Sequence, residues 1–168
     1  MKKNFINIID HSFNNLSSII DRAKELKKHR NKNKSFLKTL DGKILVMIFE
    51  IPSTRTRVSF ELAISELGGK AIILESNNTH LSRGETTEDT ARVLDRYCDI
   101  FMLRTTDHKK FDVYKEKSSR PIINGLSNVC HPCQVMSDIM TFEEHRGSIK
   151  NKKITWLGDS NNVLLSWV

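Results

Sequence analysis

Residues 44–69 read ILVMIFEIPSTRTRVSFELAISELGG. The first six of them, Ile44–Phe49, have the length and the branched apolar composition of a buried strand. Pro52 then blocks further ladder pairing, because proline has no backbone N–H to donate. Apolar residues follow helical spacing over 57–67, until Gly68-Gly69 ends the run. This stretch therefore predicts a buried strand, a short turn and a helix.

The turn between strand and helix has the composition of an anion cradle. Its sequence is Ser53-Thr54-Arg55-Thr56. Free backbone N–H groups and the helix dipole favour an anion at the start of a helix. Hydroxyls add donors there, and Arg55 and Arg57 add charge-assisted, potentially bidentate ones. The sequence predicts a phosphate- or carboxylate-binding site, and the alternative is an ordinary N-cap followed by two solvated arginines.

Strands and helices alternate along the rest of the chain, as a parallel α/β sheet requires. Further strands are predicted near 70–74, 99–104 and 120–123, and further helices near 13–28, 87–97, 107–117 and 132–145. Thr86 followed by Asp89 resembles a capping box for the helix near 87–97. In such a sheet the loops after the strands meet at one edge, where ligands bind. Ser53–Thr56, Arg104 and His131 follow or end predicted strands, so we expect them to face one cleft. The predicted fold class is α/β, a parallel sheet with helices on both faces.

The net charge of +7 is concentrated in one segment. Residues 22–34 carry seven Lys or Arg against the acidic Glu25. Such a block can touch nucleic acid. No aromatic residues interleave it, and its residues continue a helix with an apolar side, so a solvated helix end is the favoured interpretation. We expect no nucleic-acid partner.

No apolar run approaches the roughly 20 residues of a membrane span. The first residues, Met1-Lys2-Lys3-Asn4, lack the apolar core of a signal peptide. The sequence therefore predicts a cytoplasmic protein without a membrane partner.

The chain has 3 cysteines, too few for a secreted disulfide framework. Cys130-His131-Pro132-Cys133 has spacing that can mark a redox pair or half a zinc site. No second ligand pair accompanies it, and Cys98 has no neighbouring Cys or His partner. We expect neither a metal nor a cofactor, with redox chemistry at the cysteine pair as the weaker alternative.

The last segment has the pattern of a second unit. A polar link at 150–153 precedes Ile154–Leu157, which has the composition of a fresh buried strand, and residues 161–168 then begin a helix. One strand and two helical turns cannot bury a core. We therefore predict a first domain over 1–150 and, over 151–168, the beginning of a truncated second α/β domain.

Taken together, these motifs resemble the aspartate/ornithine carbamoyltransferase family, N-terminal half only. The matching segments occur in family order: Ser53-Thr54-Arg55-Thr56-Arg57, Arg83-Gly84-Glu85-Thr86 leading into Asp89–Leu94, Arg104-Thr105-Thr106, His131-Pro132-Cys133-Gln134 and Gly158–Asn162. Three features resemble the ornithine enzymes rather than the aspartate enzymes: Cys133, the stretch 141–147 and the pair Asn161-Asn162.

The resemblance implies transfer of the carbamoyl group of carbamoyl phosphate to the side-chain amine of L-ornithine, giving L-citrulline and phosphate in arginine biosynthesis or arginine/citrulline metabolism. It assigns phosphate binding to Ser53, Thr54, Arg55 and Thr56, with Arg55 also neutralising charge on the bridging oxygen. It assigns the carbonyl oxygen to Arg104 and His131, and the carbamoyl NH2 to Gln134. Arg55, Arg104 and His131 are thus the implied catalytic residues. Each residue also has a non-catalytic interpretation. Arg104 and Gln134 could be ordinary surface residues, and His131 could have a structural role.

Two further roles follow from the resemblance alone. His80 belongs to a loop that completes the site of a neighbouring subunit, which implies a homotrimer, and its alternative is an exposed loop histidine. Asn162 contacts ornithine, and its alternative is a helix-capping residue. Other acceptors stay open, namely aspartate, putrescine or an acylated ornithine, as does a non-catalytic remnant that only binds phosphate or self-associates.

Overall fold

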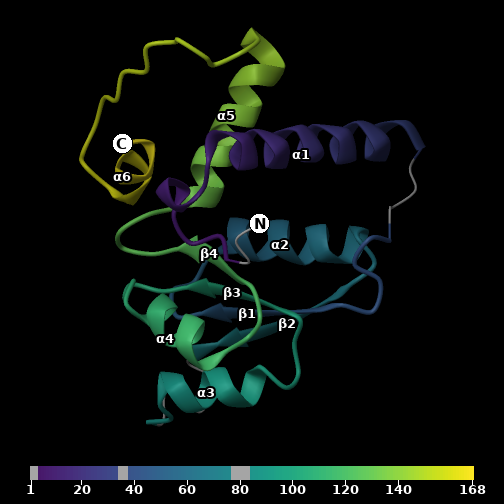
Figure 1. Ribbon diagram of the computed structural model, residues 1–168, viewed down its shortest axis with the longest axis vertical. Coiled ribbons are helices and arrows are strands. Elements are labelled where there is room, and N and C mark those ends of the chain that lie inside the picture. The colour runs from purple at the N-terminus through teal and green to yellow at the C-terminus, as the bar shows by residue number, and fades with distance from the viewer. Residues whose placement is uncertain (1–3, 34–37, 77–83) are drawn as a thin grey trace.

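The computed structural model describes residues 4–33, 38–76 and 84–168. Figure 1 shows a sheet with helices on both sides and a C-terminal helix beside α5. The elements in chain order are η1 (Ile8–Asp10), α1 (Phe13–Asn33), β1 (Ile44–Phe49), α2 (Thr54–Glu66), β2 (Lys70–Glu75), α3 (Thr87–Leu94), β3 (Ile100–Arg104), α4 (Lys110–Lys117), β4 (Ile122–Leu126), α5 (Pro132–Arg146) and α6 (Asn162–Trp167).

The four strands form one parallel sheet in the order β2-β1-β3-β4. A short N-terminal segment covers the outer edge of β4. There the Phe5 N–H donates to the Ile122 carbonyl at 2.7 Å, and the Asn124 N–H donates to the Phe5 carbonyl at 2.8 Å. This pairing satisfies backbone groups that an edge strand would otherwise expose.

Successive residues of β1 supply two separate cores, because side chains alternate across a strand. Val46 and Ile48 pack on the face covered by α3 and α4, with Tyr114 among the fully buried partners. Met47 packs on the opposite face, where α2 contributes Ile64. Helices therefore cover both faces of the sheet, as predicted (Figure 1).

Several boundaries differ from the predicted ones. Helix α2 begins at Thr54 rather than at 57, because the Ser53 hydroxyl accepts from the Thr56 N–H at 3.3 Å and caps the helix. It ends before Gly68, whose φ of 90° suits glycine. Strand β4 lies at Ile122–Leu126 rather than 120–123, and α1 is longer than expected, while α3 ends and α4 begins three residues inside the predicted limits.

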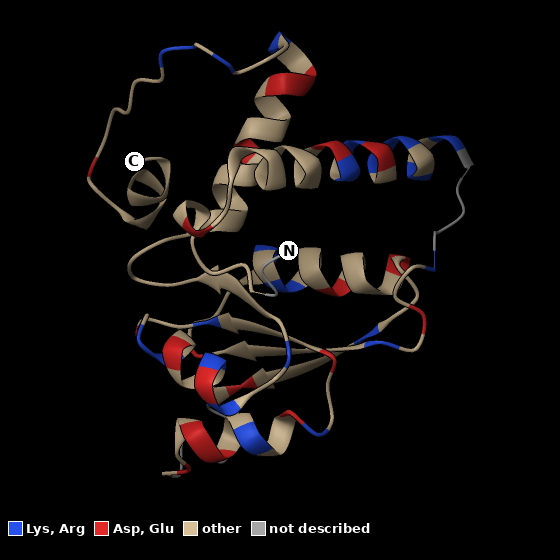
Figure 2. Cartoon of the chain, in the orientation of Figure 1, with Lys and Arg blue, Asp and Glu red and all other residues tan. Residues whose placement is uncertain are grey.

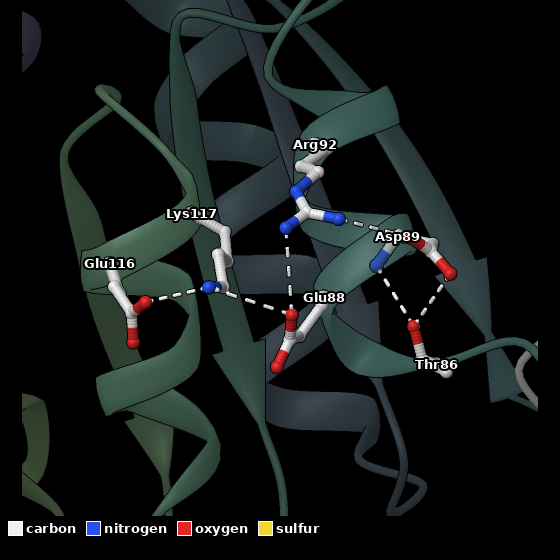
Figure 3. A network of polar contacts seen from close by, with 6 residues as sticks. All are labelled: Thr86, Glu88, Asp89, Arg92, Glu116 and Lys117. Carbon is white, nitrogen blue, oxygen red and sulfur yellow. Dashed lines mark hydrogen bonds and ion pairs between the residues drawn. The ribbon is translucent and has the colours of Figure 1, made fainter.

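A polar network fixes the start of α3 and joins it to α4 (Figure 3). The Thr86 hydroxyl accepts from the Asp89 N–H at 3.1 Å and donates to the Asp89 carboxylate at 2.8 Å. This confirms the N-cap that the spacing of Thr86 and Asp89 predicts. Arg92 and Lys117 approach the Glu88 carboxylate from α3 and α4, at 3.6 and 3.5 Å. Exposed pairs of this kind add little stability singly, and the Lys117–Glu88 pair is the contact of this network that links the two helices.

In the described part of the chain, three basic residues of α1 are paired with other helices. Figure 2 shows the positive charges along the half of α1 that leads away from α5. The ion pairs to other elements are Lys24–Glu143 at 2.7 Å, Lys27–Glu144 at 2.8 Å and Arg30–Glu66 at 2.9 Å. These contacts favour the structural interpretation of the basic segment. Within the described ranges, no helix is both long enough and apolar enough to cross a bilayer.

The strand expected at 154–157 is not formed. Ile154 and Leu157 are 55% and 91% exposed, and the segment belongs to no ladder among the described residues. A strand needs a neighbour for its backbone groups, and none lies beside this segment. The helix that follows does form: Asn161 Oδ1 caps α6 by accepting from the Val163 and Leu164 N–H groups. Figure 1 shows the chain looping away after α5 and returning so that α6 lies beside α5.

Candidate functional site

The site lies where the connections from two adjacent strands diverge. Strand β1 continues through α2 to β2, whereas β3 continues through α4 to β4 on the other side of the sheet. Loops that part in opposite directions open a crevice at the carboxyl edge of a parallel sheet. Ser53 follows β1, and Arg104 is the last residue of β3.

The first turn of α2 is the predicted anion cradle. Ser53 is the N-cap, and Thr54, Arg55 and Thr56 are the first three helical residues. Helical geometry leaves the first N–H groups without intrahelical acceptors, and the dipole makes this end positive. Arg55 is exposed and has no ion pair or hydrogen bond within the described part of the chain. A hollow of about 350 Å³ adjoins the turn, with Ser53, Thr54, Arg57 and Glu75 in its wall.

Arg57 differs from Arg55 because an acidic partner neutralises it. Its guanidinium lies 2.6 Å from the Glu75 carboxylate at the end of β2. Both side chains are about half exposed. Arg55 is therefore the uncompensated cation of the cradle, although the sequence presents the two arginines alike.

Arg104 reaches the cradle from β3. Its Nη1 lies 3.5 Å from the Thr56 hydroxyl, so the ends of β3 and α2 meet at this point. Burial lowers the pKa of Arg104, yet a guanidinium stays charged in proteins. Its buried Nε has no hydrogen-bond partner in the described structure. Arg104 thus keeps a donor for a ligand at the cradle.

His131 completes the cluster from the loop before α5. Burial lowers its pKa first, and the positive charge of Arg104 lowers it further. The ring is therefore neutral at pH 7. Its buried Nδ1 also lacks a partner in the part of the chain that the structure describes. Arg104 contacts Thr56 and its charge acts on His131, so these three residues lie at the carboxyl edge of the sheet.

The remaining predicted site residues are Gln134, Asn162 and His80. Gln134 is exposed in the first turn of α5, and its Nε2 donates to Asp138 at 2.8 Å. Asn162 lies on α6 with its amide donating to the Ser127 carbonyl at 2.6 Å, so it faces the loop that carries His131. His80 lies outside the described residues.

Sequence reasoning misses a polar cluster behind the cradle. Glu50 accepts from the Thr105 hydroxyl and from Lys110 Nζ, each at 2.6 Å. Its own N–H donates to the Arg104 carbonyl at 2.9 Å. Glu50 therefore ties the loop after β1 to the loop after β3. Its place between Phe49 and Pro52, as an acid at the end of a buried strand, is the signal that could have revealed it.

The cysteines do not have the properties of a redox pair. All three thiols are free, and burial raises the pKa of Cys98 to about 11 and that of Cys133 to about 12. Burial also raises the pKa of Cys130. Redox cysteines instead have lowered pKa values. The described residues contain no group of His, Cys, Asp and Glu side chains arranged to hold a metal ion.

A known protein family matches most of the chain. Residues 3–144 match the family described as "Aspartate/ornithine carbamoyltransferase, carbamoyl-P binding domain". The chain therefore belongs to the aspartate/ornithine carbamoyltransferase family, which confirms the resemblance seen in its motifs.

The individual relatives are ornithine carbamoyltransferases. The chain is 47% identical over 165 residues to the enzyme of Nitrobacter winogradskyi and 48% identical over 168 residues to that of Rhizobium meliloti. These matches cover 98% and 100% of this chain but 54% and 55% of the relatives. The chain thus spans about half the length of the curated relatives it matches.

Solved structures confirm the fold. The crystal structure of ornithine carbamoyltransferase from Burkholderia thailandensis superposes with a TM-score of 0.93 at 41% identity, covering 99% of this chain and 57% of that one. The ornithine carbamoyltransferase from Pyrococcus furiosus gives 0.93 at 44% identity, covering 98% and 52%. The catalytic subunit of aspartate transcarbamoylase from M. jannaschii gives 0.81 at 34% identity, covering 88% and 49%.

Proposed function

We propose that this chain is the carbamoyl-phosphate-binding half of an ornithine carbamoyltransferase, which transfers a carbamoyl group to the side-chain amine of L-ornithine and releases L-citrulline and phosphate. One observation carries the proposal. Arg104 Nε and His131 Nδ1 are buried without partners in the described structure, and both residues belong to the cluster at the cradle of α2. Unpaired buried polar atoms are costly, so two in one site point to a ligand that satisfies them.

The phosphate of carbamoyl phosphate binds at the start of α2 in this proposal. The hydroxyls of Ser53, Thr54 and Thr56 and the free N–H groups of the first turn surround it. Arg55 supplies the charge-assisted contact and offsets the charge that grows on the bridging oxygen as phosphate leaves. Arg57, whose charge Glu75 neutralises, contributes less to phosphate binding than Arg55 does.

The carbonyl oxygen of carbamoyl phosphate binds Arg104 and His131, whose buried Nε and Nδ1 are otherwise unpaired in the described structure. Attack by the amine turns the carbonyl into a tetrahedral oxyanion, and donors already aimed at that oxygen lower the barrier. Arg104 supplies a fixed positive charge. His131 supplies a ring nitrogen and stays neutral at pH 7, because burial and Arg104 hold its pKa down. No side-chain nucleophile is needed, since the substrate amine attacks.

In this proposal Gln134 binds the carbamoyl NH2. Its Nε2 is occupied by Asp138, which leaves the Oε1 to accept from the substrate. Asn162 is the proposed ornithine contact. Its Nδ2 is held by Ser127, so its Oδ1 is the atom left for the substrate ammonium group.

The proposed acceptor is L-ornithine. The catalytic subunit of aspartate transcarbamoylase from M. jannaschii has a similar fold, at a TM-score of 0.81, so aspartate is an alternative acceptor. Side-by-side assays with ornithine, aspartate, putrescine and N-acetylornithine decide between them, and we expect ornithine. We also propose a role in arginine metabolism and a location in the cytoplasm.

We propose a homotrimer in which His80 of one subunit completes the site of the next. Exposed apolar side chains support a self-association surface: Val58 and Leu62 on α2 are 56% and 46% exposed, and Ile72 on the edge strand β2 is 42% exposed. Sedimentation at tens of micromolar tests this. Monomers alone would contradict it, and Leu62→Glu should shift a trimer toward monomers.

Calorimetry with carbamoyl phosphate and with inorganic phosphate tests the ligand. Arg55→Ala should cost about 1.5–3 kcal/mol of binding, the contribution of a hydrogen bond to a charged group. Arg92→Ala is the matched control, because it removes the same charge from the exposed network on α3. Equal affinities for wild type and Arg55→Ala would sink the assignment.

Turnover tests the reaction. Orienting the second reactant can contribute on the order of 7–11 kcal/mol to rate enhancement. The relatives are about twice as long, and we place most ornithine anchors in their second half. Residues 1–168 alone should therefore stay well below about 1 turnover per second. A faster rate would show that this half also orients ornithine.

A further inference from the structure

Helix α6 forms hydrogen bonds with both ends of the loop that carries His131. Asn162 Nδ2 donates to the Ser127 carbonyl at 2.6 Å, and Ser166 Oγ accepts from the His131 N–H at 2.7 Å. Asn162 and Ser166 lie four residues apart, so they share one face of α6. Ser127 and His131 are also four residues apart, so the contacts bracket this loop.

The contact to His131 satisfies a backbone N–H at the start of helix α5. His131 is the N-cap of α5 and has no side-chain cap bond. Pro132, the next residue, has no N–H. The His131 N–H is thus the first backbone donor at this end, and Ser166 is its acceptor. The Ser166 hydroxyl proton goes to the Asn162 carbonyl at 2.7 Å, which leaves an oxygen lone pair facing His131.

The loop is held from inside the first domain as well. The Ser127 hydroxyl accepts from the Val129 and Cys130 N–H groups at 3.2 Å, and His108 Nδ1 lies 2.8 Å from it. These contacts fix the Ser127 end of the loop without α6. Near the other end, the Asn124 amide donates to the Cys130 carbonyl at 3.4 Å, and Ser166 supplies the acceptor for the His131 N–H itself.

We propose that Ser166 is a positioning residue for His131, acting through the backbone of the loop before α5. The proposal rests on the function proposed above for His131. Helix α6 lies beyond residues 3–144, which match the family's carbamoyl-phosphate-binding domain. The site of that domain is therefore set partly by a helix outside it. Displacing α6 moves the ring that polarises the carbonyl.

Two NMR measurements on residues 1–168 test the proposal without requiring turnover. Ser166→Ala removes the acceptor, and hydrogen exchange at the His131 amide should become roughly three- to tenfold faster, the loss of one hydrogen bond. The ring pKa of His131 should rise toward its ordinary value as the ring leaves its buried position and moves away from the charge of Arg104. Ser166→Thr keeps the hydroxyl and should restore both. Leu165→Ala, at a position 55% exposed, is the control on the same helix and should change neither.

The outcomes distinguish a failure of this proposal from a failure of the proposed function. Unchanged exchange in Ser166→Ala would overturn the contact, and faster exchange with an unchanged ring pKa would overturn the positioning role. If Ser166→Ala releases all of α6, Asn162→Ala should give the same two changes, and failure to do so would count against the proposal. Absence of carbamoyl-phosphate binding by the wild type would refute the proposed function while leaving both NMR results interpretable.

Discussion

Lys110 Nζ and Glu50 Oε1 form an ion pair of 2.6 Å that joins α4 to the loop after β1. The two side chains are 29% and 17% exposed, so water screens the pair only partly. Thr105 holds the second oxygen of the same carboxylate. This arrangement fixes the chain three residues before Ser53, and thereby the entry to the cradle.

Lys110→Met should destabilise the protein by about 1–2 kcal/mol, because it leaves the Glu50 carboxylate half-satisfied in a mostly buried place. Urea unfolding at neutral pH measures the change. Lys109→Met is the matched control, since Lys109 is exposed and should shift stability by less than about 0.5 kcal/mol. Equal stability of Lys110→Met and the control would show that Thr105 alone holds Glu50.

Glu75→Gln should strengthen phosphate binding about two- to fivefold. The change removes a negative charge from the wall of the anion site and frees Arg57 from its 2.6 Å pair. Two unit charges about 4 Å apart interact by about 1 kcal/mol in water. Calorimetry at low and high salt measures the effect, which should shrink as salt rises. Weaker binding by Glu75→Gln would mean that Glu75 organises the cradle.

Stability should fall as the pH drops below about 6.5. The pKa of His131 is lowered by burial and by Arg104, and that of His108 is lowered by burial. Below the ordinary histidine pKa the unfolded chain binds more protons than the folded one. The stabilisation is complete above that pKa and is lost as the pH falls toward the lowered values. Unfolding free energies between about pH 7.5 and about pH 5 test this. His108→Asn should flatten part of the slope, and a level wild-type profile would contradict the prediction.

Cys98 should resist alkylation in the folded protein. It is 3% exposed, and burial raises its pKa to about 11, so at pH 8 only about one thousandth of it is thiolate. Iodoacetamide labelling followed by peptide mass mapping should show modification only after denaturation. Rapid labelling in native buffer would indicate that the 94–99 turn opens readily.

Features that depend on adjacent residues are predictable from the sequence. Strand β1 lies at Ile44–Phe49 as expected, and the Thr86 cap forms as its spacing to Asp89 predicts. Apolar periodicity and capping act over a few residues, so they can be recognised along the chain. The same local pattern fails at 154–157, where the composition suits a strand but no neighbouring strand supplies hydrogen bonds.

The sequence by itself determined the capped turn of the predicted anion cradle, because Ser53 to Thr56 are consecutive and one turn presents them together. Only the tertiary structure decided what surrounds it. The contacts Arg104–Thr56, Lys110–Glu50 and His131–Ser166 join residues 48, 60 and 35 positions apart. Such contacts depend on strand order and on the path of the loops, which set which side chains meet at the carboxyl edge of the sheet. For the same reason Arg57 is paired and Arg55 is not: β2 ends with Glu75 beside Arg57.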